Sequence, residues 1–377
     1  MARDEDEEIP VLRPLLPTAE RLFPYLSRID ASRCYTNWGP LASELEQRLA
    51  DRLGIDGHSV VSASSGTMAL VGAILATAGR ARDRPYAILP ALTFVATAIA
   101  VEQCGYNVHL VDVAVDDWML DVRSLEAHPL LGETGLVVPV SSYGRAVAHE
   151  PWRAFQRQTG IPIVIDGAAS FETLIARPTG LLSEIPVALS FHATKAFASG
   201  EGGCVITTDE RLAESVTRSL NFGFYEDRES RSPSTNGKMS EYHAAVALAE
   251  LDGWQTKHAT LLRVAEMYRK QMHEASLEDR LVTAPVVAAC YVLYRGTDIH
   301  EVARVREALT TCKVGFRSWY GAGVHGQPHF HAVSRDSLEV TDRVAPLLIG
   351  LPVAPDLTAG DVARVVNALA LGVRWSS

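Results

Sequence analysis

The sequence predicts an α/β protein, because short apolar runs alternate with stretches of helical periodicity between about residues 41 and 210. Consecutive strands that are joined through helices pair in parallel, so this order implies a mainly parallel sheet covered by helices on both faces. The chain of 377 residues is longer than one such unit needs. We therefore expect a large α/β domain followed by a smaller α+β domain.

The N-terminal part does not follow this pattern. Residues 4–8 form an acidic run, and residues 9–40 are rich in proline without a sustained period. We expect residues 1–30 to form an acidic, extended segment. The first amphipathic helix is expected at residues 41–53, where Leu41, Leu45, Leu49 and Leu53 recur every four residues on one face.

The central part supplies the predicted strands and their crossover helices. Buried strands are expected where short runs are rich in valine, isoleucine and leucine, at residues 86–89, 108–111, 136–140, 161–165, 187–191 and 204–207. The helices between them are expected at residues 67–78, 93–104, 122–128 and 151–159. These elements place the large domain over residues 31–250.

The remainder, residues 251–377, is expected to form the smaller domain. A long helical segment begins near Met239 and continues to Met272, with a break predicted at Gly253 and Trp254. A strand at residues 288–293, a helix at residues 301–310 and a terminal helix at residues 359–371 follow it.

Composition and charge exclude several classes of protein. Lys and Arg number 35 against 45 Asp and Glu, a net charge of −10 that argues against binding to nucleic acid or anionic membranes. The cysteines are scattered without a CxxC motif, which fits neither a zinc site nor a disulfide framework. No apolar run reaches the length of a membrane span, and the N-terminus lacks the basic start of a signal peptide. We expect a cytoplasmic protein.

Polar residues follow the predicted strands at the edge where parallel sheets bind ligands. Residues 62–70, SASSGTMAL, form a turn of small residues that opens a helix. Its backbone N–H groups and the hydroxyls of Ser65 and Thr67 suit a phosphate, although they equally suit an ordinary helix cap. The segment is not a P-loop, because the lysine of that motif is missing.

Three further residues are candidates for chemistry at the same edge. Asp166 ends an apolar strand, where a buried carboxylate needs a cation or a hydrogen-bond donor as its partner. The partner is either a protonated pyridine nitrogen or the backbone of a helix that Asp166 caps. Lys195 follows the strand at residues 187–191, where desolvation would make it an amine nucleophile and an open surface would leave it an ordinary lysine. Phe94 suits either stacking on a flat cofactor or core packing.

In this order and spacing the segments resemble the fold-type I pyridoxal phosphate enzymes, specifically the sugar aminotransferase family named for DegT, DnrJ, EryC1 and StrS. The resemblance covers about residues 35–370. The matching pieces are SGTMAL, LPALTFVATAIAV, VHLVDV, VIDGAAS, SFHATK with GEGG, NGKMSEYHAAVAL and LPVAPDLTAGDV. The resemblance implies a large domain with a mainly parallel sheet of the seven-stranded type and a smaller C-terminal α+β domain.

The resemblance also implies roles for individual residues. Lys195 would be the Schiff-base lysine, Asp166 the partner of the pyridine nitrogen of pyridoxal 5'-phosphate, and Phe94 the residue stacked on its ring. The residues expected around the phosphate are Gly66, Thr67, Met68 and Ser190. Asn236 would reach the phosphate of a neighbouring subunit, which implies a homodimer with shared active sites.

Some positions depart from the family pattern. Ala169 stands three residues after the ring aspartate, where the family usually has glutamine or histidine. The approach to the second strand, residues 80–88, and the segment that begins at Asn236 also differ. These differences bear on the substrate, whereas the lysine, the phosphate turn and the aspartate remain.

Two histidines are expected near the substrate. His192 lies three residues before Lys195, and His325 opens the histidine-rich stretch HGQPHFH. Imidazoles are common metal ligands, but the family has a histidine near the substrate opening in this region. We therefore predict no metal site.

The function implied is transfer of an amino group from L-glutamate or L-glutamine to a keto sugar, most often nucleotide-linked, in glycan or secondary-metabolite biosynthesis. Alternatives are a cyclitol or non-sugar ketone as acceptor and a pyridoxamine-dependent sugar dehydration, against which Lys195 argues because such dehydratases have histidine there. A noncatalytic, regulatory homologue is the alternative from another class.

Overall fold

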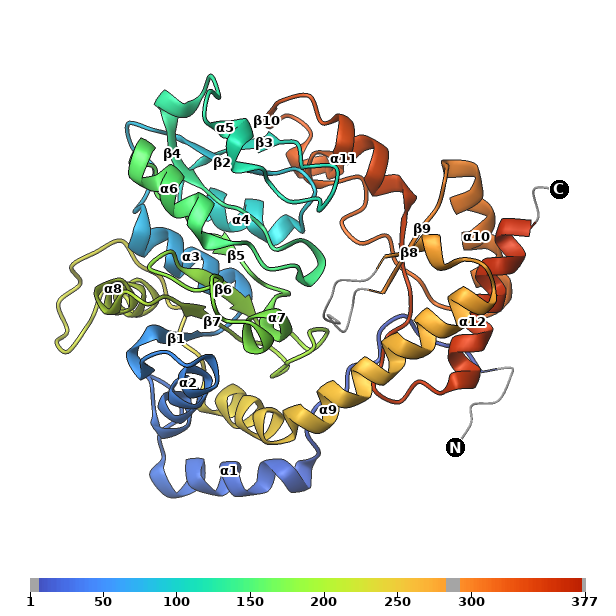
Figure 1. Cartoon of the computed structure of the whole chain (residues 1–377). Coiled ribbons are helices and arrows are strands. Elements are labelled where there is room, and N and C mark those ends of the chain that lie inside the picture. Colours follow the sequence, from blue (N-terminus) through green and yellow to red (C-terminus); the bar gives the residue numbers. More distant parts are fainter. Residues whose placement is uncertain (1–6, 283–291, 375–377) are drawn as a thin grey trace.

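The computed structural model describes residues 7–282 and 292–374, and it contains the expected central sheet flanked by helices (Figure 1). Its strands are β1 (Val60–Ala63), β2 (Tyr86–Pro90), β3 (Asn107–Val111), β4 (Thr134–Val137), β5 (Ile165–Asp166), β6 (Val187–Ser190) and β7 (Gly203–Ile206). They run in the orders β1-β7-β6-β5 and β4-β2-β3, and short β10 (Ser334–Arg335) extends the sheet beside β3. Parallel bridges from Val137 to Ile163 and from Val140 to Asp166 join the two halves.

The sheet is mainly parallel, as predicted. The pairs β5–β6, β2–β4, β2–β3 and β10–β3 are parallel, whereas β7 runs antiparallel to both β1 and β6. Strand β1 was not expected from the sequence. It consists of four residues, all buried, and the last two, Ser62 and Ala63, belong to the small-residue segment 62–70 that was predicted as a turn. Only Val60 and Val61 remain as an apolar run.

Side chains of each strand alternate between two cores, one on each face of the sheet. In β2, Ile88 packs into one core, while Ala87 and Leu89 pack into the other. In β6 the same alternation places Leu189 and Ala188 in different cores. Both faces are therefore buried, which explains why the strands read as continuous apolar runs.

The helices divide between the two faces accordingly. Those that contribute to one core are α3 (Gly66–Thr77), α4 (Val95–Gln103) and α8 (Glu210–Leu220). Those that contribute to the other are α2 (Pro40–Leu53), α5 (Val122–Leu125), α6 (His149–Thr159), α7 (Phe171–Ala176) and the first part of α9 (Glu241–Glu274). Helix α2 buries the leucine stripe that predicted it, Leu41, Leu45, Leu49 and Leu53.

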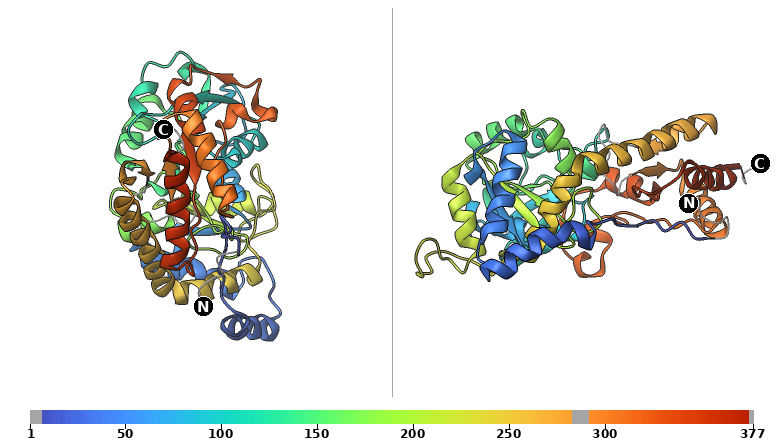
Figure 2. Two further views of the ribbon diagram at one scale, coloured as in Figure 1. Left: turned by 90° about the vertical axis from the view of Figure 1, so that its right-hand side faces the viewer. Right: turned by 90° about the horizontal axis from the view of Figure 1, so that it is seen from below.

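The C-terminal part forms the smaller α+β unit beside the sheet. Its antiparallel sheet has the order β11-β9-β8. Its elements are β8 (Leu281–Val282), β9 (Leu293–Arg295), α10 (Ile299–Thr311), α11 (Glu339–Val344), β11 (Leu348–Gly350) and α12 (Ala359–Arg374). Helix α9 runs from the large unit outward to α12, so one helix spans both units (Figure 2). The strand predicted at residues 288–293 lies mostly outside the described residues, and β9 begins at Leu293.

The break predicted at Gly253 and Trp254 is wrong, because both residues lie inside α9, a continuous helix of 34 residues. A glycine inside a helix costs only about 1 kcal/mol, which the packing of a long helix outweighs. Gly253 serves a close contact instead, since a Cβ there would lie 2.5 Å from the guanidinium of Arg21. The expected domain boundary at residues 250 and 251 thus falls inside a continuous helix.

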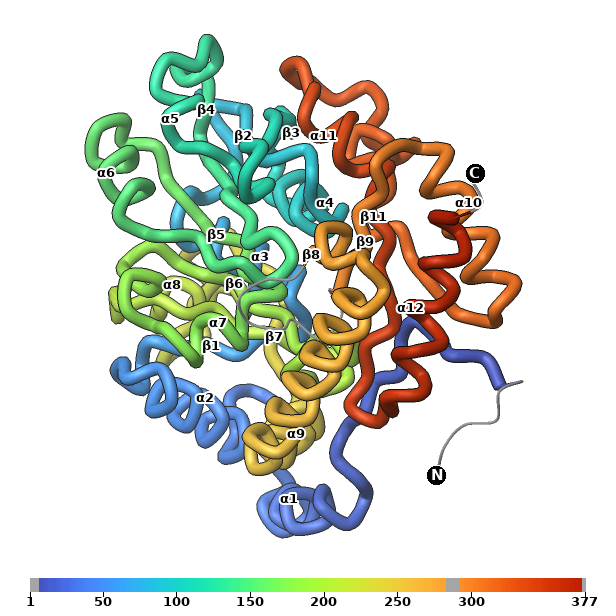
Figure 3. The backbone as a smooth tube through the Cα atoms, turned by 45° about the vertical axis from the view of Figure 1, so that its right-hand side comes forward, coloured from blue at the N-terminus to red at the C-terminus, as the bar shows by residue number. Residues whose placement is uncertain are grey.

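The extended N-terminal segment is only partly extended, because residues 19–32 form helix α1 (Ala19–Ser32). This helix carries Pro24 within it, but Leu22, Leu26 and Ile29 still recur on one helical face, a local signal that the prediction of an extended segment missed. Its packing against α9 stabilises it. Before α1 the chain follows the smaller unit through bridges from Ile9 to Val314 and from Leu12 to Val353, and then crosses to the large unit (Figure 3).

None of the helices in residues 7–282 and 292–374 is both long enough and apolar enough to cross a membrane.

Candidate active site

A pocket of about 340 Å³ lies at the carboxyl ends of the parallel strands, where open α/β sheets bind ligands. Most of the predicted site residues line it, namely Gly66, Thr67, Phe94, Asp166, Ser190, His192 and Lys195. The smaller unit closes the pocket with Arg317, Trp319 and Tyr320, and the N-terminal segment adds Leu12. The pocket therefore combines residues from both units.

Asp166, at the end of β5, is the buried carboxylate of the pocket, with 5% of its surface exposed. Its Oδ2 accepts a 2.7 Å hydrogen bond from the Thr97 hydroxyl, and its Oδ1 accepts a 3.0 Å bond from the Ala168 backbone N–H. Burial raises the pKa of Asp166, while these two donors and the positive charge of Lys195 lower it. A cation bound against this carboxylate would further favour its ionised form.

The turn that opens α3 is shaped for close approach of its backbone. Ser65 caps the helix, because its Oγ accepts a 3.1 Å hydrogen bond from the Met68 N–H. A Cβ on Gly66 would lie 2.6 Å from the Cβ of Ser190, so only glycine fits between α3 and the end of β6. Thr67 and Ser190 line the pocket beside the helix N-terminus, which attracts anions.

Met68 lies next to the turn, with its side chain directed away from the pocket, and its place beside a phosphate stays a prediction. Its side chain packs against the apolar core beneath α3 and is not among the pocket-lining residues. Its backbone N–H is already bonded to Ser65. The structure thus gives Met68 a part in the helix cap and the core.

Lys195 and His192 lie on the loop that follows β6. Lys195 is half-buried and lines the pocket together with Asp166. His192 is exposed, with its Nδ1 2.8 Å from the Thr194 hydroxyl and its Nε2 3.8 Å from a carboxylate oxygen of Glu201. Both side chains therefore have access to a ligand in the pocket.

Phe94 is the N-cap residue of α4, and 57% of its surface is exposed although its ring is large and apolar. Its backbone is extended, which turns the side chain away from the helix and toward the pocket that it lines. An aromatic ring exposed on a pocket wall is available for stacking on a flat ligand. The core-packing alternative for Phe94 does not hold.

Asn236 and His325 lie outside the pocket lining of this single chain. Asn236 is exposed, and its Oδ1 accepts a 2.7 Å hydrogen bond from Lys238 Nζ. His325 lies in a short 3-10 helix, with its Nε2 2.8 Å from Asp342 Oδ1.

Sequence reasoning missed several residues that the fold brings to this site. Thr97 and Thr93 lie one helical turn apart next to Phe94, so their spacing at the helix start was an available signal. Arg317, Trp319, Tyr320 and Leu12 come from distant parts of the chain. No local sequence pattern predicts that these segments fold back onto the edge of the sheet.

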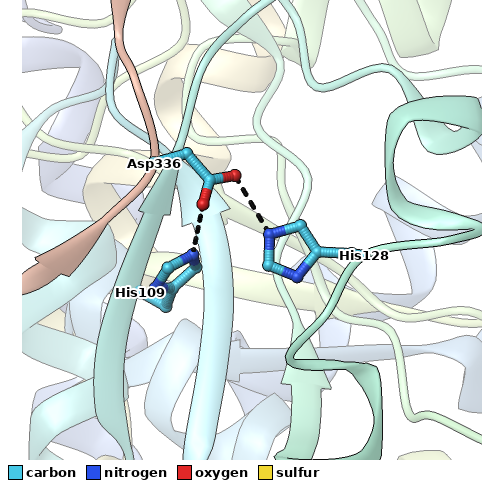
Figure 4. Close-up of side chains that lie close together, drawn as sticks. All are labelled: His109, His128 and Asp336. Carbon is cyan, nitrogen blue, oxygen red and sulfur yellow. Dashed lines mark hydrogen bonds and ion pairs between the residues drawn. The ribbon is translucent and has the colours of Figure 1, made fainter.

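Outside the pocket, two histidines and an aspartate meet between β3 and β10 (Figure 4). Asp336 Oδ1 lies 3.2 Å from His109 Nε2, and its Oδ2 lies 3.0 Å from His128 Nε2. The Leu130 N–H donates to His128 Nδ1 at 3.2 Å, which places the ring proton of a neutral His128 on Nε2. A nitrogen that donates to a carboxylate is not available as a metal ligand, so we interpret this cluster as a hydrogen-bonded tie.

Comparison with known proteins agrees with this geometry. A model of the DegT/DnrJ/EryC1/StrS aminotransferase family matches residues 18–370. The chain belongs to this family. Protein Rv3402c of Mycobacterium tuberculosis is 31% identical over 370 residues, which cover 96% of this chain and 89% of that protein. The dTDP-4-amino-4,6-dideoxy-D-glucose transaminase of Shigella dysenteriae is 29% identical over 271 residues, 71% of each chain.

Solved structures of the DegT/DnrJ/EryC1/StrS family also match the fold. DesI, crystallised in the presence of its TDP-sugar product, superposes with a TM-score of 0.85 and 28% identity, over 98% of this chain and 94% of that one. The predicted fold-type I aminotransferase architecture is therefore confirmed, as is membership of an aminotransferase family. Named relatives of the chain are sugar transaminases.

Aminotransferases of this family use pyridoxal phosphate, and the residues present fit that group. The buried carboxylate of Asp166 suits a cationic ring nitrogen, and Phe94 presents an exposed ring in the same pocket. The cradle in which Gly66 leaves no room for a Cβ suits a phosphate at the N-terminus of α3. Lys195 lines the same pocket, and its positive charge lowers the pKa of Asp166.

Proposed function

We propose that this chain is a pyridoxal phosphate-dependent aminotransferase that moves an amino group from L-glutamate or L-glutamine to a keto sugar. The observation that carries the proposal is that one pocket contains Lys195, Asp166 and the Gly66 cradle together. The names of the relatives support a sugar as acceptor, since they include a dTDP-amino-sugar transaminase and a GDP-perosamine synthase. A nucleotide-linked keto sugar is the acceptor that we favour.

Each part of the pocket has a task in this reaction. Pyridoxal phosphate, when bound, supplies an electron sink for the negative charge that forms when a C–H bond next to nitrogen breaks. Asp166 would hold the proton on the ring nitrogen, because its buried carboxylate is oriented by Thr97 and by the Ala168 N–H. Gly66, Thr67 and Ser190 would hold the phosphate.

Lys195 acts on both halves of the reaction. Its amine would hold the cofactor, within the same pocket that would receive the amino donor. Its Nζ would serve as the base that takes a proton from the substrate carbon and as the acid that returns one, for the donor and for the keto acceptor. Asp166 would support both halves by remaining ionised beside the ring nitrogen.

We further propose that the protein acts as a homodimer with shared sites. Asn236 is exposed on the loop before α9 and lies outside the pocket of its own chain, which leaves it accessible to a second copy. Light scattering on the purified protein tests this. A mass of two chains is expected, and a monomer that is active at low concentration would contradict the proposal.

The visible absorbance of purified protein loaded with pyridoxal phosphate tests the central assignment. The wild-type protein is expected to be yellow and to bleach when L-glutamate or L-glutamine is added, whereas Lys195→Ala lacks the native colour. Lys270→Ala is the matched control, because Lys270 is an exposed lysine on α9. Failure to retain any cofactor would overturn the enzyme assignment, and bound cofactor that ignores both donors would favour a noncatalytic homologue.

A further inference from the structure

Five aromatic residues of the described chain have left-handed backbones: Trp38, Trp118, Tyr143, Phe222 and Tyr320. Three of them, Trp118, Tyr143 and Tyr320, have φ of 58°, 52° and 68° and lie close together in the fold. Bulky L-residues seldom adopt this conformation, because Cβ crowds the following carbonyl oxygen. The three residues are far apart in the sequence. Backbone strain that persists in a fold is a pointer to function when it gathers at one place.

These three residues do gather at one place and form a stack that we call the aromatic column. The ring of Tyr320 stacks on that of Tyr143, with centroids 4.8 Å apart and planes 26° apart. The ring of Trp118 meets the other side of the column edge-on, 5.9 Å from the Tyr143 centroid at 81°. The guanidinium of Arg145 caps the column 5.1 Å above Trp118.

Hydrogen bonds fix the column at its base. The Ser142 hydroxyl donates to the Trp118 carbonyl at 2.7 Å, and Arg145 donates to the Asp117 carbonyl at 2.8 Å. Trp118 and Tyr143 are each 3% exposed. The base is therefore held rigidly in the large unit, while the top residue, Tyr320, belongs to the segment that crosses from the smaller unit.

The top of the column is part of the pocket. Tyr320 is half-buried and lines the pocket with its neighbour Trp319 and with Arg317, whose guanidinium lies 5.6 Å from the centre of the Trp319 ring. Ala169 lines the same pocket and packs against the buried cluster that contains Trp118 and Tyr143. A short side chain at residue 169 leaves that side of the pocket to the aromatic residues.

Core packing accounts for only part of this arrangement. Burial explains why Trp118 and Tyr143 contact each other. The left-handed backbone of Tyr320 follows from its place as third residue of the turn Ser318–Gly321, in which the Gly321 N–H donates to the Ser318 carbonyl at 3.2 Å. Neither the turn nor core packing explains why a partly exposed tyrosine lines the pocket wall. A platform for a ligand accounts for its place there.

We propose that the ring of Tyr320 is the platform on which the sugar ring of the acceptor binds, and that Tyr143 and Trp118 are positioning residues that hold it there. This inference rests on the proposed aminotransferase function. A pyranose has an apolar face of C–H groups, which the electron-rich face of an aromatic ring attracts. The positive charge of Arg317 on the same wall suits an anionic group attached to the sugar.

Two kinds of amine test the proposal on the same loaded protein. L-Glutamate tests the reaction with the amino donor. The amino sugars dTDP-4-amino-4,6-dideoxy-D-glucose and GDP-perosamine test the sugar reaction in the reverse direction, in which the amino sugar gives up its amino group. Bleaching of the visible band and calorimetric binding are measured for wild type, Tyr320→Ala and Tyr320→Phe. We expect Tyr320→Ala to weaken sugar binding about tenfold while its response to L-glutamate is unchanged, and Tyr320→Phe to behave as wild type.

The outcomes distinguish failure of the inference about Tyr320 from failure of the proposed sugar aminotransferase function. Wild-type protein that ignores L-glutamate, or that responds to it but to neither sugar, overturns the sugar aminotransferase assignment and the inference with it. If Tyr320→Ala binds the sugar as tightly as wild type does, the inference about Tyr320 is wrong while the aminotransferase assignment stands. Binding of dTDP without a sugar is expected to be equal in both proteins, and its loss in Tyr320→Ala would show that the ring binds the base instead.

The positioning part has its own pair of variants. Tyr143→Leu removes the ring behind Tyr320, whereas Tyr143→Phe keeps the stack and loses the 3.4 Å hydrogen bond to the Trp319 carbonyl. We expect Tyr143→Leu to raise KM for the sugar about threefold or more with little change for L-glutamate, and Tyr143→Phe to change neither. Equal losses on both amines in Tyr143→Leu would reduce Tyr143 to a structural residue.

Discussion

The hydroxyl of Thr97 donates a 2.7 Å hydrogen bond to Asp166 Oδ2, and its oxygen lies 2.9 Å from the Thr93 hydroxyl. Because the single proton of Thr97 is directed to Asp166, Thr93 is the donor in the second bond. The start of α4 therefore supplies a chain of two hydroxyls that points its protons toward the buried carboxylate. This chain opposes the increase in pKa that burial causes at Asp166.

Replacing Thr97 with valine tests this relationship. Thr97→Val keeps the shape but removes the donor, so the pKa of Asp166 rises further. The carboxylate must be ionised to pair with a cationic ring nitrogen. We therefore expect the acid limb of the pH–activity profile to move to higher pH and the rate at neutral pH to fall about tenfold. Thr97→Ser is the matched control, and an unmoved acid limb in Thr97→Val would refute the role.

Gly66→Ala tests the phosphate cradle. The added Cβ would lie 2.6 Å from the Cβ of Ser190 and 3.1 Å from its Cα, which belongs to the backbone of β6 and does not rotate away. We expect a loss of affinity for pyridoxal phosphate of at least tenfold, measured by titration of the visible absorbance. In Gly132→Ala, the control, the new Cβ meets nothing within 4 Å. Equal affinities in both variants would show that the cradle is not needed.

The fold was predictable where a local pattern decides the structure. Buried strands such as β2 and β6 are continuous apolar runs, and the leucines of α2 recur at one helical spacing. Helix α1 was missed although Leu22, Leu26 and Ile29 recur on one helical face. The unbroken course of α9 was not predictable, because tertiary contacts with distant segments stabilise it. The guanidinium of Arg21 beside Gly253 is one such contact, joining residues far apart in the chain.

The residues of the candidate site also differ in whether a local sequence pattern predicts them. Asp166 and Lys195 each follow a predicted strand, so their place at one edge of the sheet could be inferred from the sequence. Tyr320 and Leu12 could not, since they reach the pocket only when the smaller unit and the N-terminal segment fold back. The orientation of Met68 could not be inferred either, because a residue next to the turn also lies on the core-facing side of the helix that follows.

The tie between β3 and β10 gives a prediction about stability. Asp336→Ala removes the acceptor shared by His109 and His128, two buried imidazoles. We expect the free energy of unfolding to fall by about 1–3 kcal/mol in urea titrations. Glu266→Ala, which breaks an exposed ion pair with Arg269, is expected to change it by less than about 1 kcal/mol.

A metal titration tests the interpretation of that tie. If Nε2 of His128 is a proton donor, Zn²⁺ added to wild-type protein at neutral pH should not raise its melting temperature. A rise in Tm that occurs in wild type and is absent in Asp336→Ala would show that the cluster binds the ion instead.

Glu172 gives the molecule a predictable dependence on pH. This carboxyl, on α7, is 3% exposed, and burial raises its pKa to about 7. His258 Nε2 lies 3.1 Å from Glu172 Oε1 without forming a hydrogen bond, so the pair only partly offsets the burial. The ring of Trp254 stacks on His258 at 5.1 Å and helps to keep water from the pair.

The sign of the effect follows from the direction of that shift. A carboxyl with a raised pKa in the folded state favours folding while it is protonated, and it loses this contribution as the pH rises from its ordinary value of 4.5 to about 7. Glu172→Gln cannot ionise. We therefore expect the stability of wild type relative to Glu172→Gln to fall by up to about 3 kcal/mol between roughly pH 4 and pH 8. Urea unfolding of both proteins across this range measures the difference, in which titrating groups distant from Glu172 and His258 cancel. Parallel stability curves would show that Glu172 ionises as freely in the folded chain as in the unfolded one.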